Sequence, residues 1–305
     1  MADATVRGAG SAAPAGAPGR RRRGEVAALL PWVFIGLFFA FVLAFLVVPA
    51  AQVLVGAFLD DQGFTLQYVA QLLQPRYLNA YWVTTKLSLV SALLGTLIGL
   101  VTAYLVQLEG APGWLRSLVT SFSGMAANFA GVPLAFAFIS CLGTLGVVTL
   151  WLKAVGLDLY GAGFKIFDFT GLVVTYLYFQ IPLMVIIITP AIQGMRKQWR
   201  EACENLGGGS WHYWRYVAIP VLTPPTFAGF ILLFGNAFAS YATPYALTSG
   251  LIPLVPIEIG NLLSGNVFAA PQLGDALALG MIVVMAVAML LYSLLQRRAA
   301  RWQQR

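Results

Sequence analysis

Charge, histidine and cysteine are all scarce in this sequence. Asp, Glu, Lys and Arg make up 10% of its 305 residues, whereas they make up roughly a quarter of an ordinary soluble domain. Hydrophobic residues make up 59%, and the mean hydropathy is +0.80. The scarcity of charge excludes a typical soluble domain and indicates an integral membrane protein. The apolar runs are long and do not alternate with polar residues, so they predict membrane-spanning helices and exclude a membrane β-barrel.

The scarce residues also exclude most kinds of catalysis. His212 is the only histidine and lies in a charged loop, whereas an intramembrane serine–histidine protease or a zinc protease needs such groups within the apolar segments. Cys141 and Cys203 have no metal-ligand or disulfide spacing, and we expect both to be buried packing residues. No G-x-x-x-x-G-K-[ST] phosphate loop occurs. We therefore expect no catalytic residue, no metal site and no bound cofactor, so the chain is not an enzyme.

Six apolar runs exceed the roughly 20 residues that a helix needs to cross a bilayer. They cover residues 26–59, 83–107, 115–141, 171–192, 222–243 and 276–296. The first run is too long for the apolar core of a cleaved secretory signal, so we expect it to remain as the first membrane helix. The sequence therefore predicts an all-α integral membrane domain of six transmembrane helices over residues 26–305. A disordered basic tail is expected at residues 1–25.

The distribution of Lys and Arg predicts the orientation of the chain. If the N-terminus is inside the cell, the loops and tails on that side hold fourteen Lys and Arg residues, and the opposite side holds four. Both termini and the loop at residues 193–221 are then cytoplasmic. The apolar runs at residues 143–155 and 251–268 are too short or too interrupted by proline to cross, and we expect them to form caps on the extracytoplasmic side. The basic excess is an orientation signal and not a nucleic-acid site.

The cytoplasmic stretch at residues 199–220 (WREACENLGGGSWHYWRYVAIP) predicts a hairpin of two short helices. Trp199, Cys203 and Leu206 share one face of a first helix over residues 195–206. By helical patterning alone, such a hairpin is an amphipathic pair of helices that lies on the inner surface of the membrane.

The end of the first helix and the start of the second are also marked in the sequence. Gly207 to Gly209 supply the positive φ that a sharp turn needs. Ser210 is the expected N-cap of the second helix, at residues 211–218, and Pro220 is expected to close it.

The spacing within this hairpin resembles the EAA loop of ABC-transporter permeases of the binding-protein-dependent import class. That motif consists of Glu-Ala-Ala, a glycine six residues after the glutamate, and a hydrophobic-x-hydrophobic-proline ending nineteen residues after it. The matching positions are Glu201, Ala202, Cys203, Gly207, Val217, Ile219 and Pro220. Cys203 stands in place of the second alanine, and Val217 and Ile219 are conservative replacements. The hairpin also lies between the fourth and fifth predicted spans, its usual place in that family.

The resemblance covers residues 28–297 and implies the type I (MetI-like) importer permease fold, with cytoplasmic coupling helices at about residues 194–221. It implies a permease subunit of a bacterial plasma membrane that works with a second, different permease subunit, two ATPase subunits and an extracytoplasmic solute-binding protein. The ATPase partner uses ATP and Mg²⁺. The residues that the resemblance assigns to ATPase coupling are Glu201, Ala202, Cys203, Leu206, Gly207, Val217, Ile219 and Pro220. The alternative is a stand-alone secondary transporter or channel whose basic hairpin lies on lipid.

Three further stretches are similar to permeases for spermidine/putrescine-type uptake. They are residues 129–139 (FAGVPLAFAFI), 178–192 (YFQIPLMVIIITPAI) and 236–250 (NAFASYATPYALTSG). A polyamine is therefore the expected substrate, and iron, sulfate, phosphonate and thiamine are the alternatives that share this architecture.

Polar residues within the predicted spans are candidates for the solute path, because polar groups are costly in lipid and usually face the interior of a bundle. They are Asn128, Gln180, Asn236 and Tyr241. The alternative is that they hydrogen-bond between helices as structural contacts. Gly95 and Gly99 form a G-x-x-x-G pattern that predicts close helix packing. No acidic residue lies well within a predicted span, so the spans give no separate argument for a cationic substrate.

Overall fold

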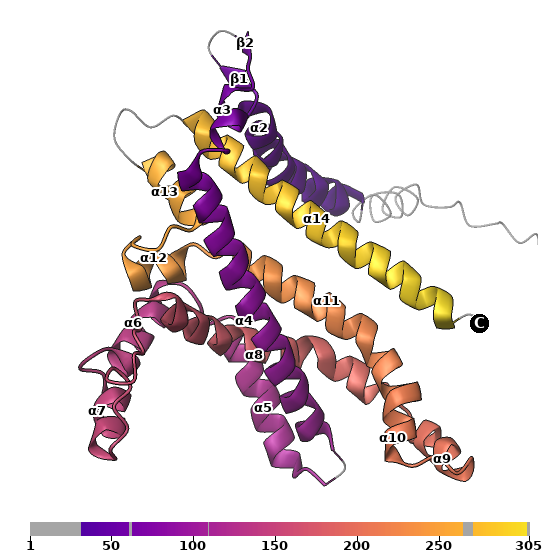
Figure 1. The fold of residues 1–305 in the computed structure, drawn as a ribbon. Coiled ribbons are helices and arrows are strands. Elements are labelled where there is room, and N and C mark those ends of the chain that lie inside the picture. The colour runs from indigo at the N-terminus through magenta and orange to yellow at the C-terminus, as the bar shows by residue number, and fades with distance from the viewer. Residues whose placement is uncertain (1–31, 61–62, 109, 265–270, 304–305) are drawn as a thin grey trace, which may run out of the picture. The chain divides into compact units, whose positions relative to one another are not determined.

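The computed structural model describes residues 32–60, 63–108, 110–264 and 271–303, most of them in helices (Figure 1). Within these ranges six segments are long and apolar enough to cross a membrane. They are Trp32–Gly56, Pro75–Gln107, Val132–Ala154, Phe169–Gln193, Ser210–Phe238 and Pro271–Leu294. The prediction of an all-α membrane protein with six spans is confirmed. The predicted tail at residues 1–25 lies outside the described residues.

The chain divides into two compact units, one ending at Val53 and one beginning at Leu54. The described residues of the first unit belong to the span that starts at Trp32, which contains a π-helical turn, η1 (Leu43–Val47), and continues into α2 (Val48–Gly56). This span is apolar on all sides and its large side chains are exposed. Such a helix is typical of a membrane span and not of a soluble helix.

The second unit holds the remaining elements. A short antiparallel pair, β1 (Leu59–Asp60) and β2 (Gly63–Phe64), precedes α3 (Gln67–Gln71). The long helices are α4 (Pro75–Gln107), α8 (Phe169–Gln193), α11 (Ile219–Phe238) and α14 (Pro271–Gln303). The shorter elements are α5 (Gly113–Ala126), α6 (Val132–Leu142), α7 (Val147–Ala154), α9 (Lys197–Asn205), α10 (Ser210–Tyr213), η2 (Trp214–Ala218), α12 (Ala242–Thr248) and α13 (Val255–Ser264).

The core of the second unit is the contact between α4 and α8, with α11 packed against both. Gly95 and Gly99 of α4 allow this contact, because a Cβ on Gly95 would lie 2.9 Å from Gln180 and a Cβ on Gly99 would lie 2.6 Å from Met184. Met184 also meets Gly229 of α11, where an added Cβ would be 2.6 Å from the methionine sulfur. The predicted close packing at the G-x-x-x-G pattern is therefore confirmed.

A row of small polar side chains lies in the same contact. Thr84, Ser88 and Ser91 are buried on α4, and each hydroxyl donates a hydrogen bond to a backbone carbonyl one turn earlier. The Gln180 amide of α8 donates to the Ser91 hydroxyl at 3.1 Å, and the Thr84 hydroxyl accepts a bond from the backbone N–H of Val255 at 2.9 Å. Hydroxyls that bond to their own helix can be buried in a membrane protein at low cost. The helices therefore pack closely while most of these polar groups keep partners.

The third span differs from the prediction. Residues 115–141 do not form one continuous helix, because α5 and α6 are separated by a break at residues 127–131. The apolar segment long enough to cross is Val132–Ala154, which consists of α6, a turn and α7. Gly131 has φ = +78°, and Pro133 in the first turn of α6 has no N–H with which to continue a preceding helix.

The fifth span is also displaced from the predicted residues 222–243. A continuous helix ends at Phe238, and the chain breaks at residues 239–241 before α12. Pro244 lies in the first turn of α12, and its ring would clash with the carbonyl four residues earlier if the helix continued. The N–H of Gly131 donates to the Thr243 hydroxyl at 2.8 Å, so this break lies against the break between α5 and α6.

The two shorter apolar runs form helices, α7 and α13. The prediction that residues 143–155 do not take part in a span is wrong, because α7 belongs to the segment Val132–Ala154 that is long and apolar enough to cross. The extracytoplasmic position of α13 stays a prediction. α13 packs against α14 and α4, and the buried residues that join the three helices are Tyr77, Ala80, Val255, Leu273 and Leu277. Glu258 on α13 is buried and accepts a hydrogen bond from Arg76 on α4, with Nη2 and Oε2 2.6 Å apart. This ion pair fastens α13 to the first turn of α4.

Candidate functional site: an exposed helical hairpin

α9 and α10 form the predicted hairpin, at the lower right of Figure 1. The N-cap of α10 is Gly209 and not Ser210, because Gly209 takes the extended backbone conformation (φ −83°, ψ −179°) that an N-cap needs. Ser210 is thereby placed inside the first helical turn. The prediction of Ser210 as the cap is wrong by one residue.

The second helix of the hairpin does not end at Pro220. It continues as one segment from Ser210 to Phe238 through the π-helical turn η2, in which the N–H of Ile219 donates to the carbonyl of Trp214. A π-helical turn contains an extra residue, which shifts the carbonyl that the proline ring would otherwise meet. The predicted termination at Pro220 is therefore wrong, and no loop separates the hairpin from α11.

The turn between α9 and α10 depends on two glycines for different reasons. The prediction of positive φ at Gly207 to Gly209 is confirmed for Gly207 alone, which has φ = +79° and whose N–H donates to the carbonyl of Glu204 at 2.9 Å. Gly208 lies so close to α9 that an added Cβ would be 2.7 Å from the Cys203 sulfur, and its N–H donates to the Cys203 carbonyl at 2.9 Å. Gly207 therefore supplies the backbone conformation, and Gly208 supplies the space.

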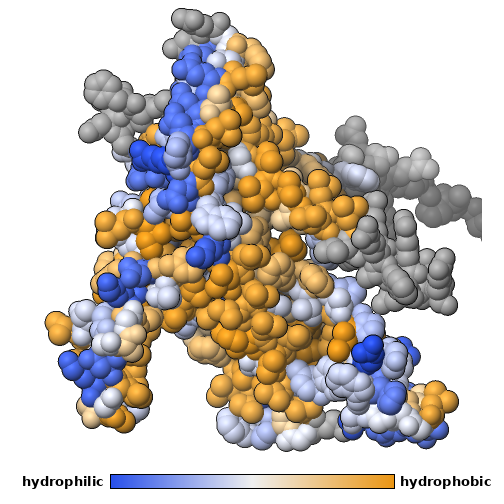
Figure 2. Space-filling view, viewed as in Figure 1, coloured by the Kyte–Doolittle hydropathy of each residue, from blue (hydrophilic) through white to orange (hydrophobic). Residues whose placement is uncertain are grey.

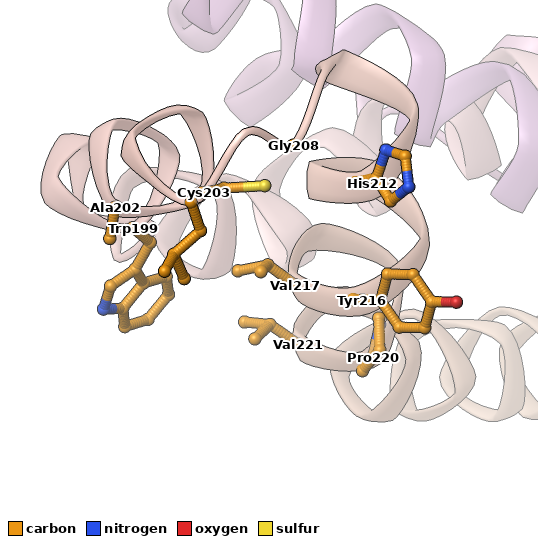
Figure 3. Close-up of a pocket in the computed structure, with 10 residues that line it drawn as sticks. Trp199, Ala202, Cys203, Gly208, His212, Tyr216, Val217, Pro220 and Val221 are labelled. Carbon is orange, nitrogen blue, oxygen red and sulfur yellow. The ribbon is translucent and has the colours of Figure 1, made fainter.

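An apolar groove of about 650 Å³ lies between α9 and the helix that begins at Ser210 (Figure 3). Its lining residues are Trp199, Ala202, Cys203, Leu206, Gly208, His212, Tyr216, Val217, Pro220 and Val221. The groove thus brings together five of the residues predicted to couple to an ATPase, namely Ala202, Cys203, Leu206, Val217 and Pro220. It does not bring in the other three, Glu201, Gly207 and Ile219.

The hairpin exposes large apolar side chains beside its charged ones. Leu206 is 89% exposed, Trp211 70% and Tyr216 68%. Arg200 and Glu204 form an exposed ion pair one turn apart on α9, with Nε and Oε1 3.0 Å apart. Hydrophilic and hydrophobic residues lie side by side at the lower right of Figure 2. Clustered exposed leucine and aromatic side chains are unfavourable in water, so this surface is suited to a protein partner or to lipid.

An aromatic contact fixes the hairpin to the bundle. Trp214 of η2 packs edge-on against Tyr104 near the end of α4, with ring centroids 5.0 Å apart. Ala218 at the end of the same turn is fully buried. The hairpin therefore has two connections to the core, one through the chain into α11 and one through ring packing onto α4.

The predicted path residues lie in different settings. Gln180 is buried in the contact of α8 with α4, where its amide N–H₂ has a partner and its Oε1 has none among the described residues. Asn128 is exposed at the break between α5 and α6 and donates to a backbone carbonyl one turn earlier. Asn236 is exposed on α11, and Tyr241 stacks on Tyr245 with ring centroids 5.3 Å apart. No hydrogen bond in the described chain joins two of the four, and their place in a path stays a prediction.

Sequence reasoning missed part of the groove. His212 and Tyr216 line it and stack with ring centroids 6.2 Å apart. Their spacing of four residues within the second predicted helix is the signal that points to a shared face. Cys203 is half-buried in the groove and Cys141 is exposed on the last turn of α6, so the prediction that both cysteines are buried is wrong. Among the described residues, no group of His, Cys, Asp and Glu could hold a metal ion.

Six apolar spans, and an exposed hairpin whose second helix begins the fifth span, match the arrangement predicted for a type I importer permease. A solved chain of a bacterial ABC transporter involved in the import of the acidic polysaccharide alginate superimposes with a TM-score of 0.70 at 17% identity. The superposition covers 92% of this chain and 99% of that chain. A family model described as the binding-protein-dependent transport system inner membrane component matches residues 95–304. The chain belongs to this family, whose members are ABC transporter permeases and not enzymes.

The names of curated relatives include two kinds of substrate. The "Probable sulfate transport system permease protein cysT" of Chlorella vulgaris is 26% identical over 58% of this chain, and the match spans 64% of that relative, less than two thirds of its length. The spermidine/putrescine transport system permease protein PotB of Haemophilus influenzae is 21% identical over 85% of this chain and 92% of its own.

Proposed function

We propose that this chain forms part of a solute path through a bacterial plasma membrane and couples that path to ATP hydrolysis by a separate subunit. The observation that carries the proposal is the hairpin itself, an apolar groove with exposed Leu206 and Trp211 beside the charged pair of Arg200 and Glu204. Apolar side chains at a rim of charged ones are typical of a surface that is buried by a protein partner. Five of the predicted coupling residues, Ala202, Cys203, Leu206, Val217 and Pro220, line this groove.

The partners follow from the family to which the chain belongs. We propose a second, different permease subunit, two ATPase subunits that use ATP and Mg²⁺, and an extracytoplasmic solute-binding protein. The name of the family model, which describes binding-protein-dependent transport, supports the last of these. The excess of Lys and Arg on one side of the spans supports an orientation with both termini and the hairpin in the cytoplasm.

For the substrate we propose a small charged solute, and the relatives supply the two chemistries to compare. The first is a polyamine, which the sequence predicts and which the PotB relative transports by name. The second is sulfate, the substrate in the name of the cysT relative. Iron, phosphonate and thiamine are further candidate substrates for the same architecture. Sulfate is an anion and a polyamine is a cation, so measuring which of the two is taken up separates the two proposals.

The proposal is tested by reconstituting the complex in liposomes and measuring ATP-dependent uptake of labelled sulfate and labelled spermidine. We expect Leu206→Asp to abolish co-purification of the ATPase and uptake, because a buried carboxylate in the docking surface is strongly unfavourable. The matched control is Leu251→Asp, because Leu251 is 81% exposed outside the hairpin and its replacement leaves ATPase association unchanged. Uptake by liposomes that contain no ATPase would instead establish a stand-alone transporter or channel.

A further inference from the structure

Lys86 lies in the first turn of the apolar run at residues 83–107 of α4. Residues 32–58, 83–107, 132–142, 171–192, 219–238 and 276–294 contain Lys86 and no other Asp, Glu, Lys or Arg. A charge within a membrane segment is costly, and such residues mark ligand or ion sites more often than they serve packing. The ammonium group of Lys86 therefore lies at the edge of an apolar segment, where a ligand of opposite charge would stabilise it.

The surroundings of Lys86 supply only part of what an ammonium group needs. Its Nζ lies 5.1 Å from the centroid of the Phe169 ring, which is a favourable but weak cation–π contact. The ion pairs of Arg76 with Glu258 and of Arg200 with Glu204 do not involve Lys86. The side chain is exposed. Its charge is thus available to a ligand.

Lys86 lines an open cavity of about 580 Å³ that three separate parts of the chain form. These parts are the outer turns of α4, the residues around the start of α8, and the segment after α12 at residues 252–253. The polar and aromatic lining residues are Asn79, Trp82, Lys86, Asp168, Phe169 and Thr170. The volume lies within the range of ordinary small-molecule sites.

Four side chains of the lining can donate hydrogen bonds. The ammonium of Lys86, the amide of Asn79, the indole N–H of Trp82 and the hydroxyl of Thr170 can all donate. Asp168 is the one acid in the lining, and it is the N-cap residue of the 25-residue helix α8. The positive end of a helix dipole offsets part of the charge of such a carboxylate. The lining therefore sets one ammonium group and three neutral donors against one carboxylate.

We propose that this cavity binds an oxyanion group, sulfate or phosphate, through Lys86 and the neighbouring donors. A tetrahedral oxyanion accepts several charge-assisted hydrogen bonds at once, which matches a lysine surrounded by amide, indole and hydroxyl donors. Two sources present the same chemistry, a free anion and the phosphate of a lipid headgroup. This inference rests on the cavity and does not depend on coupling to an ATPase. If a free anion binds there, the site also narrows the substrate class proposed above, because Lys86 repels a polyamine.

The experiment uses the purified full-length chain without an ATPase, so its outcome is separate from that of the transport measurement. In a maltoside detergent, which carries no phosphate, sulfate and phosphate are titrated calorimetrically at constant ionic strength. In a second arm, native mass spectrometry counts phosphatidylglycerol molecules that the protein retains. We expect Lys86→Gln to weaken the binding by about tenfold, as for the loss of one charge-assisted hydrogen bond. Lys86→Arg retains it within about threefold, because the charge remains.

The matched control is Lys153→Gln on α7, which removes an equal charge outside the cavity and leaves binding unchanged. Binding of sulfate in the first arm identifies a free anion, and retention of lipid alone identifies a headgroup. Thr170→Val keeps the lysine and removes one hydrogen-bond donor. We expect it to weaken the binding of either ligand, and it replaces Lys86→Gln in the test if that variant does not fold. The proposal is overturned if the wild-type protein binds neither ligand, or if Lys86→Gln and Thr170→Val both bind like the wild type.

Discussion

The contact of α4 with α8 and the hairpin of α9 with η2 place their polar and apolar groups in opposite ways. In the helix contact, the polar side chains of Ser91 and Gln180 are buried and bonded to each other. In the hairpin, Leu206 and Trp211 are apolar and exposed. In the helix contact, the buried polar side chains have hydrogen-bond partners within the chain. In the hairpin, the exposed apolar side chains are left for a binding partner. We therefore expect substitutions in the first to change stability and substitutions in the second to change association.

The largest expected effect is on the helix contact. Gly99→Leu places side-chain atoms where Met184 and the backbone carbonyl of Ile181 already lie, at 2.6 and 2.9 Å from an added Cβ. Overpacking of this kind costs about 3 kcal/mol of the free energy of unfolding. The midpoint of thermal unfolding in detergent measures the loss. Gly124→Leu on α5 is the matched control, because an added Cβ there meets nothing within 4 Å. Equal midpoints for the two variants would contradict close packing at Gly99.

A smaller effect is expected at the turn of the hairpin. Gly207→Ala forces a Cβ into a position with φ = +79°, which costs about 1 kcal/mol and loosens the turn locally. Hydrogen exchange should quicken over residues 199–210 while the exchange of α4 and α8 stays the same. Gly209→Ala is the control, since Gly209 has φ = −83° and an added Cβ there has open space. If both variants exchange alike, the positive φ does not hold the turn.

The smallest effect is expected at Gln180. Its Oε1 is buried without a partner in the described residues, so replacing the amide by an apolar side chain of similar size removes an unsatisfied group as well as a hydrogen bond. We expect Gln180→Met to change the free energy of unfolding by less than about 1 kcal/mol, because the two contributions oppose each other. Thermal unfolding measures stability, and uptake in liposomes measures function. Loss of uptake at unchanged stability would favour the predicted role of Gln180 in the solute path over a packing role.

The features that depend on composition and local spacing could be predicted from the sequence. Apolar run length is sufficient to identify a membrane protein of six spans, and a glycine every fourth residue predicted the contact at Gly95 and Gly99. The turn at Gly207 followed from the need for positive φ. The breaks near Gly131 and Pro244 were missed because averaging over an apolar run hides a single proline, which is tolerated in some membrane helices and breaks others.

Features that depend on contacts between distant segments could not be predicted from the sequence. The helix continues past Pro220 because η2 adopts π-helical bonds, and a sequence offers no simple sign of that choice. The groove depends on how closely α9 approaches the next helix, which Gly208 controls through its contact with Cys203. The cavity at Lys86 is formed by segments that are far apart in the chain. The sequence around Lys86 therefore does not indicate which other residues line the cavity.

The absence of a loop after the hairpin has a mechanical consequence. Residues 210–238 form one continuous helical segment of about 40 Å, since a helix advances about 1.5 Å per residue. One end of this segment carries half of the groove. The other end lies at the break before α12, where the Thr243 hydroxyl accepts a hydrogen bond from the N–H of Gly131. We expect a tilt of the hairpin, such as the proposed ATPase partner would impose, to be transmitted along this segment past the Trp214–Tyr104 contact.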